Sequence, residues 1–231
     1  MATIEWTEPD DPSGRELDDL RAAPVVTLEW HEAAMAARVG LSRQLNALAA
    51  GKPEADGRGD EPGWNHHVEG ALGELAAAKY LGLYWSGSVN TYKFGGDVGA
   101  KIQVRTRSEC WYGLKIKKTD RDADIFVLVL GRCPVYHVRG WCYAGDAKAH
   151  LDAHPEAKKT WVLDPAGRGS PNIFVPQSAL RPMADLLADR APPPGLAPLP
   201  AAGYRTSVRR LGCPACRPRH EALRSAGRGA K

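Results

Sequence analysis

The sequence predicts an α/β protein in which helices flank a central β-sheet. Two stretches with helical periodicity, residues 28–50 and 65–81, come first, and a series of strand patterns follows between residues 101 and 141. The run Asp124–Leu130 (DIFVLVL) is apolar on both faces, as expected of a strand covered on each side. The chain has 231 residues, 43% of them hydrophobic, which is enough for one substantial core.

Both predicted helices have recognisable ends. Thr27 is placed to cap the first helix, Leu28–Ala50. The second helix, Asn65–Leu81, ends at Gly82 and has an apolar stripe at helical spacing. Glu74 lies on the flank of that stripe, so we expect its carboxylate at the edge of the surface on which the helix packs.

Strand patterns fill the middle of the chain. A weak one covers Tyr84–Tyr92, and clearer ones follow at Lys101–Thr106, Tyr112–Lys117, Asp124–Leu130 and Val135–Trp141. In the first clear strand the apolar residues alternate with polar ones, so one face carries Lys101, Gln103, Arg105 and Arg107. The domain is completed by a short helix, an extended piece and a last helix, predicted at Ala144–Asp152, Asn172–Pro176 and near Leu180–Arg190.

Charge and composition divide the chain into four regions. We expect an acidic, poorly ordered leader over residues 1–26, a folded domain over 27–190, a Pro-rich linker over 191–203 and a basic tail over 204–231. The tail carries eight Lys or Arg against Glu221, which fits binding to nucleic-acid backbone through Arg209 and Arg210. A solvated, disordered terminus is the alternative.

Cysteine usage and hydropathy indicate the compartment. Five cysteines, an odd number, and no apolar signal segment favour a reducing cytoplasmic setting. The longest strongly apolar run, Ile125–Leu130, is far shorter than the ~20 residues that a bilayer requires, so no membrane association is expected.

The stretch 95–106 (GGDVGAKIQVRT) places a carboxylate at the start of a polar strand face. Asp97 follows a glycine turn, and Gln103 comes six residues later. Glu74 on the preceding helix offers a second carboxylate. Hard oxygen ligands of this kind bind Mg²⁺ or Mn²⁺, and phosphodiester hydrolysis needs such a metal to activate water and to neutralise charge on the phosphate.

The order of these features resembles the PD-(D/E)XK nuclease superfamily, and in particular its small phage and resolvase-like branch. The resemblance spans about residues 64–185 and depends on the helix with GALGE (Gly70–Glu74), Asp97, the Gln103-Val-Arg105 tripeptide, a lysine-bearing strand and DIFVLVL. It implies a restriction-endonuclease-like core. It also implies that Asp97 binds the metal, Glu74 is the helical acid, Gln103 occupies the second acidic position and Arg105 occupies the lysine position.

Two positions depart from the pattern of that superfamily. Gln103 offers a carbonyl oxygen but no charge, and Arg105 cannot be deprotonated, although it can hold a phosphate with two hydrogen bonds. The role of the missing lysine falls to Lys101, Lys115 or Lys117, and the sequence does not choose among them. Lys101 and Arg107 are further candidates for contact with nucleic acid.

The basic tail also contains a possible zinc site. Cys213, Cys216 and His220 have the spacing C-x₂-C-x₃-H, which suits three ligands of a structural zinc ion. The fourth ligand would be Cys110, Cys133, Cys142 or a distant histidine. A flexible basic arm without zinc is the competing interpretation.

The sequence therefore predicts a metal-dependent, phage-associated DNA nuclease in the cytoplasm of a bacterial host, acting as a homodimer like related enzymes. A nuclease-fold protein that binds DNA without cutting it is the first alternative, because Gln103 and Arg105 are what a decayed site would contain. A virion assembly protein, whose charged termini join copies of the chain, is the second.

Overall fold

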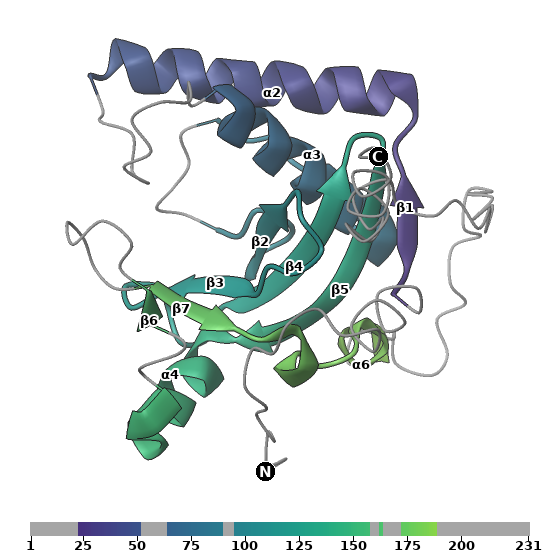
Figure 1. Ribbon diagram of the computed structural model, residues 1–231. Helices are drawn as coiled ribbons and strands as arrows, with labels where there is room; N and C mark the ends of the chain where they lie inside the picture. Colours follow the sequence, from purple (N-terminus) through teal and green to yellow (C-terminus); the bar gives the residue numbers. More distant parts are fainter. Residues whose placement is uncertain (1–22, 52–63, 90–94, 158–161, 164–171, 189–231) are drawn as a thin grey trace, which may run out of the picture.

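The computed structural model is an α/β protein with two β-sheets (Figure 1). It describes residues 23–51, 64–89, 95–157, 162–163 and 172–188. The strands are β1 (Val25–Thr27), β2 (Ile102–Arg107), β3 (Leu114–Lys117), β4 (Ile125–Arg132), β5 (Val135–Tyr143), β6 (Val162–Leu163) and β7 (Asn172–Val175). The helices are α2 (Trp30–Ala49), α3 (Trp64–Leu81), α4 (Ala144–Ala153), α6 (Met183–Ala188) and two short 3₁₀ turns, Pro155–Ala157 and Gln177–Ala179.

The central sheet is mixed and has the strand order β1-β5-β4-β2. β5 is antiparallel to both β1 and β4, whereas β2 runs parallel to β4, with Gln103 opposite Phe126 and Arg105 opposite Leu128. A second, antiparallel sheet has the order β3-β7-β6. Helices α2 and α3 cover one face of the central sheet, and the second sheet lies with α4 on the other (Figure 1).

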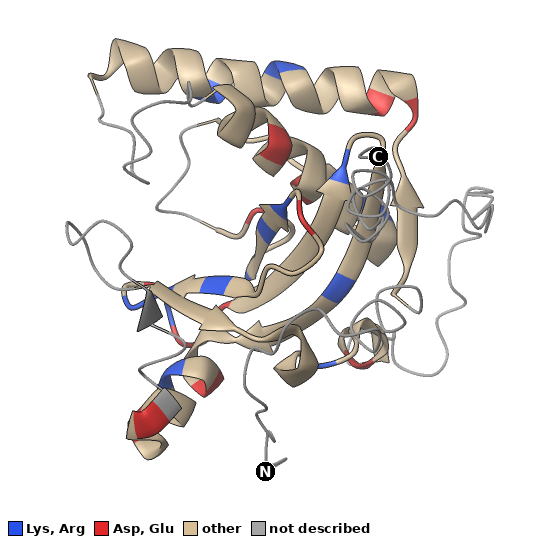
Figure 2. Ribbon diagram, viewed as in Figure 1, with Lys and Arg blue, Asp and Glu red and all other residues tan. Residues whose placement is uncertain are grey.

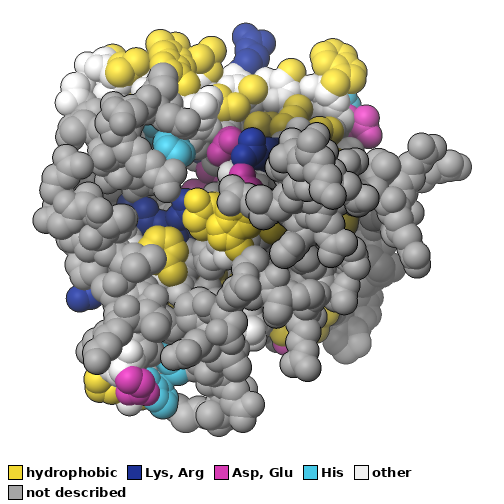
Figure 3. Space-filling view, in the orientation of Figure 1, with side chains coloured by type: hydrophobic (Ala, Val, Ile, Leu, Met, Phe, Trp, Pro, Cys, Tyr) yellow, Lys and Arg dark blue, Asp and Glu magenta, His cyan; other side chains and the backbone are white. Residues whose placement is uncertain are grey.

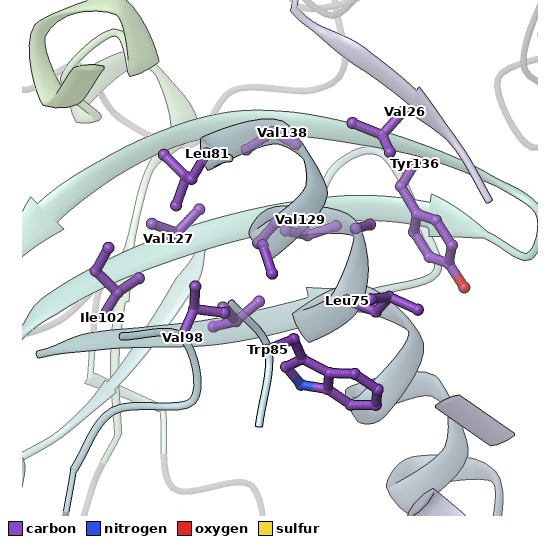
Figure 4. Close-up of a cluster of buried hydrophobic side chains, with 14 of the residues drawn as sticks. Val26, Leu75, Leu81, Trp85, Val98, Ile102, Val127, Val129, Tyr136 and Val138 are labelled. Carbon is purple, nitrogen blue, oxygen red and sulfur yellow. The ribbon is translucent and has the colours of Figure 1, made fainter. Parts of the chain in front are cut away.

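Strand β4 contributes side chains to both hydrophobic cores, which confirms the prediction of a central strand covered on each side. Val127 and Val129 face α3 and join the larger core, part of which Figure 4 shows. Phe126, Leu128 and Leu130 face the second sheet and α4 and join the smaller core. The alternation of side chains along one apolar strand therefore holds the layers on its two faces together.

Helix α3 is enclosed because small residues let its neighbours approach. A Cβ atom added to Gly73 would lie 1.9 Å from Thr106 Oγ1 on β2. On the other side, a Cβ atom at Gly40 of α2 would lie 2.5 Å from Val68 Cα of α3. All residues of α3 from Ala71 to Ala78 are buried as a result.

The structure corrects several predicted boundaries at the start of the chain. Residues 25–26, assigned to the leader, belong to β1, because the β-branched run Val25–Thr27 adds an edge strand to β5. Thr27 is therefore not a helix cap. Helix α2 begins at Trp30 instead, after a capping box in which the Glu29 N–H donates to Glu32 Oε2 at 2.7 Å.

Two further predictions differ from the structure. No strand forms within the described part of Tyr84–Tyr92, because hydrogen bonds from side chains, described below, hold this segment in place of a strand partner. The last helix starts at Met183, after Pro182, which is favoured at a helix start. The linker 191–203 and the basic tail 204–231 lie outside the described residues, as do Arg209, Arg210, Cys213, Cys216 and His220.

None of the helices in the described ranges combines the length and the hydrophobicity that crossing a bilayer requires.

The close approach at Gly73 predicts opposite effects for two glycines of the GALGE segment. Gly73→Ala should lower the free energy of unfolding by about 1–3 kcal/mol, because its methyl group overlaps Thr106. Gly70→Ala is the matched control, because a Cβ there meets no atom within 4 Å and alanine favours the helix by roughly 0.5–1 kcal/mol. Urea unfolding of both variants tests this, and a stabilised Gly73→Ala variant would contradict the described contact.

Candidate active site

Glu74 is buried inside the molecule and forms an ion pair with Arg43 of helix α2. Arg43 Nη1 donates to Glu74 Oε1 at 2.6 Å, and Nη2 donates to Oε2 at 2.8 Å. Only 8% of the Glu74 side chain and 12% of the Arg43 side chain are exposed. Two parallel hydrogen bonds to a guanidinium are the strongest pairing available to a buried carboxylate, so Glu74 is fixed in position.

The segment that follows α3 is tied to the same pair. Trp85 Nε1 donates to Glu74 Oε2 at 3.1 Å, and Arg43 Nε donates to the Ser88 carbonyl at 3.0 Å. These bonds to side chains of α2 and α3 hold the segment in place, instead of the backbone hydrogen bonds that a neighbouring strand would provide. They explain why residues 83–89 follow an irregular path although their composition resembles that of a strand.

Asp97 lies beside the start of β2 on a tight glycine turn. Gly95 has φ +108°, which favours glycine, and a Cβ atom at Gly96 would lie 2.6 Å from the Ile102 backbone. The turn brings Asp97 Oδ2 within 2.8 Å of the Val104 N–H, which donates to it. Within the described part of the chain, the other carboxylate oxygen, Oδ1, has no hydrogen-bond partner.

The pKa of Asp97 is raised from 3.8 to about 6. Burial is the largest cause, and the negative charge of Glu74 is the second. The Val104 N–H, Arg105 and Arg43 act in the opposite direction but do not outweigh these two causes. Glu74 is therefore close enough to Asp97 for their charges to repel, and this repulsion makes Asp97 more difficult to ionise.

Arg105 is held beside Asp97 by several groups at once. Its Nη1 is 4.0 Å from Asp97 Oδ2, and its Nη2 donates to Asp120 Oδ2 at 3.5 Å. The guanidinium carbon lies 4.7 Å from the centre of the Phe126 ring, as in a cation–π contact. Asp120 is fixed in turn by the Lys117 N–H, which donates to its Oδ2 at 2.8 Å. Arg105 is therefore a positioned cation.

The other predicted residues lie around this centre in different ways. Gln103 is on the same strand face as Arg105, and its Nε2 donates to the Gly95 carbonyl at 3.4 Å. Lys101 is exposed just before β2. Lys115 and Lys117 are not on a strand adjacent to β2, because β3 pairs with β7 in the second sheet. Figure 2 shows basic residues on β2 and β3 and acidic residues on α3 above them.

Three residues of this centre were missed from the sequence. Arg43 lies on the stripe of α2 that includes the buried residues Ala36, Gly40 and Gln44, and a charge on a buried stripe is a signal that could have found it. Trp85 and Asp120 gave no such signal, because their contacts depend on how distant segments pack.

Carboxylate ligands for a metal are few here. Among the described residues no group of three or more His, Cys, Asp or Glu side chains is arranged to hold a metal ion. Asp97 Oδ1, the Gln103 amide oxygen and Glu74 are the predicted ligands, and hard oxygen atoms of this kind fit Mg²⁺ or Mn²⁺. Figure 3 shows acidic and basic side chains next to one another below the upper edge of this face.

Comparison with known proteins adds no assignment, since no family model, curated protein or solved structure matches this chain.

The raised pKa of Asp97 predicts that this residue destabilises the fold at neutral pH. Above pH 6 its charge is buried unfavourably, whereas between pH 6 and 3.8 the folded state holds the extra proton. Asp97→Asn should therefore raise the free energy of unfolding by about 1–2 kcal/mol at pH 7.5. That gain should shrink as the pH falls and vanish near pH 4. This gain is smaller than the free energy that corresponds to the whole pKa shift, because 28% of the Asp97 side chain is exposed and solvent screens its charge.

Urea unfolding at several pH values measures this effect. Asp185→Asn is the control, because Asp185 is exposed on α6 and its substitution should change stability by less than about 0.5 kcal/mol at each pH. An Asp97→Asn variant that is less stable at pH 7.5 would show that the two arginines outweigh burial and Glu74.

The ion pair between Arg43 and Glu74 predicts strong coupling between the two residues. Arg43→Met or Glu74→Gln alone should each cost about 3–5 kcal/mol, because either change leaves the remaining partner buried without its counterpart. The double variant should lose at least about 1 kcal/mol less than the sum of the two. A double-mutant cycle by urea unfolding measures the coupling, and additive effects would contradict a direct pair.

Proposed function

We propose that this protein is a divalent-metal-dependent phosphodiester hydrolase acting on DNA, with a restriction-endonuclease-like core. The observation that carries the proposal is the pair of carboxylates formed by Glu74 of α3 and Asp97 beside the start of β2. Asp97 has a raised pKa, and its Oδ1 has no hydrogen-bond partner among the described residues. A buried carboxylate that ionises reluctantly is a common feature of catalytic sites.

The charge of the centre supports the binding of a cation. Three carboxylates, those of Glu74, Asp97 and Asp120, lie together with two guanidiniums, those of Arg43 and Arg105. The sum is one negative charge when all five groups are ionised. A divalent cation would favour the ionised form of Asp97, since an adjacent positive charge lowers the pKa of a carboxyl group.

Asp97, Glu74 and the Gln103 carbonyl oxygen are the groups that would hold Mg²⁺ or Mn²⁺. When bound, the metal would activate water and neutralise charge on the phosphate. Arg105 is the proposed group that holds a phosphate oxygen of the substrate, because Asp97, Asp120 and Phe126 hold its guanidinium in place and a guanidinium can donate two hydrogen bonds to a phosphate.

A lysine is still needed beside the attacking water. Lys101, Lys115 and Lys117 remain the candidates, and Lys101 lies closest in sequence to the strand that carries Gln103 and Arg105. The expected homodimer and the phage-associated setting in a bacterial cytoplasm stay predictions, as does zinc binding by Cys213, Cys216 and His220.

The ion pair of Glu74 favours a second candidate function. Because both oxygens of Glu74 are engaged by Arg43, Asp97 is left as the carboxylate with an open oxygen. A site with one available acidic ligand fits a protein that binds nucleic acid without cutting it. The two functions differ in whether a metal allows cleavage.

A cleavage assay with supercoiled, linear and four-way-junction DNA tests the proposal. The native protein with Mg²⁺ or Mn²⁺ should cut at least one substrate, and EDTA should abolish cutting. Asp97→Ala should lower the rate by roughly 100-fold or more, because it removes the proposed metal ligand. Asp185→Ala, at an exposed position of α6, should leave the rate unchanged. Binding of DNA without cutting under every condition would favour the second function.

A further inference from the structure

The loop between β2 and β3 carries a stack of planar side chains whose outer member, Trp111, is exposed. The rings of Trp111 and Tyr112 are stacked, with centroids 6.0 Å apart and an interplanar angle of 29°. The guanidinium carbon of Arg107 lies 5.3 Å from the centre of the Tyr112 ring. Trp111 remains 49% exposed, so a large aromatic surface at the end of this stack is available for contact.

Buried hydrogen bonds hold this loop in place. Gln177, which is 3% exposed, donates from Nε2 to the carbonyl oxygens of Cys110 and Tyr112, the latter at 3.1 Å. Arg139 Nε in turn donates to Gln177 Oε1 at 2.9 Å. The backbone on both sides of Trp111 is thereby fixed from the protein interior. An exposed ring on a fixed backbone loses little conformational entropy when it binds a ligand.

The stack continues the polar face of the strand that carries the candidate active site. Gln103, Arg105 and Arg107 alternate onto one face of β2, at a spacing of about 6.6 Å between neighbours. Arg107 therefore lies about 13 Å along the strand from Gln103. A nucleic-acid strand with a phosphate at Arg105 would reach the stack within a few nucleotides.

The surrounding charges discriminate among possible ligands for the ring. Arg107 already occupies one aromatic contact, and Lys115 and Lys117 follow on β3. Positive charges repel a cationic ligand such as an ammonium group but attract a polyanion. Base stacking on an aromatic ring combined with a basic track is the arrangement that single-strand-binding proteins use.

We propose that Trp111 stacks on an unpaired nucleobase, so that the substrate class includes a single-stranded segment. The inference rests on the proposed function, because it takes the strand face with Arg105 as the path of the nucleic acid. A duplex offers no free base face in its interior, and an overhang, a flap or a single strand does. DNA and RNA share this chemistry.

Fluorescence anisotropy in EDTA tests the proposal without cleavage. The probes are a fluorescein-labelled oligothymidylate, an oligouridylate, an abasic strand of the same length and a duplex. The native protein should bind the oligothymidylate about tenfold or more tightly than the abasic strand. Trp111→Ala should bring that ratio close to one, and Trp111→Phe should keep most of it. Trp30→Ala is the control, because Trp30 is 81% exposed on α2 and should not affect the ratio.

Each outcome decides the proposal. An unchanged ratio in Trp111→Ala, or equal binding of both probes by the native protein, overturns it, whereas loss of the ratio in Trp111→Ala alone supports it. An equal effect with oligouridylate extends the site to RNA. If the ratio of the affinities for oligothymidylate and the abasic strand depends on Trp111 but no metal supports cutting, the stacking proposal is supported and the nuclease function is contradicted. If cutting depends on Asp97 but the ratio does not depend on Trp111, stacking alone fails.

Discussion

A carboxylate can be buried only where a cation and hydrogen-bond donors replace its water, and Glu74 imposes this condition on the layers around it. Its helix, α3, lies between α2 and the central sheet, so the replacement donors must come from those layers. Arg43 comes from α2, and Trp85 comes from the segment that returns toward the sheet. Because Gly40 and Gly73 carry no side chain, the layers can come close enough for these bonds. The close packing of these layers and the pairing of the Glu74 charge therefore depend on each other.

The close packing around Glu74 also makes the ionised form of Asp97 less favourable. The turn at Gly95 and Gly96 directs a second carboxylate toward the strand beside Glu74, and the protein supplies one backbone N–H and a distant guanidinium contact for it. A fold selected for stability alone would have a neutral residue at this position. An unfavourably buried charge is typical of sites where a bound ligand balances it. The buried charge of Asp97 is the main physical reason why we propose a function for this centre.

The fold was largely predictable from the sequence because periodicity reports which faces are buried. The two long helices, the central strand β4 and the alternation of β2 follow from local patterns, and the Glu74–Asp97 pair follows from the order of elements. Which strands pair with one another could not be predicted from the sequence. β3 has the composition of a neighbour of β2, yet it pairs with β7, so that Leu114 lies opposite Val175, 61 residues later in the chain. Alternation fixes which face of a strand is buried but not which strand lies alongside it. Arg43, Trp85 and Asp120 were missed for the same reason, since their roles depend on contacts between distant segments.

The pairing of Arg43 with Glu74 also determines how the molecule can come apart. If α2 left the surface while the rest stayed folded, Glu74 would lose both hydrogen bonds from Arg43, and the apolar side chains of α3 that α2 covers would meet water. We therefore expect α2 to unfold in the same cooperative unit as α3 and the sheet. Helix α2, although it lies on the outside of the fold, is an integral part of the domain, and a fragment that begins after it would not be a smaller working version of the protein.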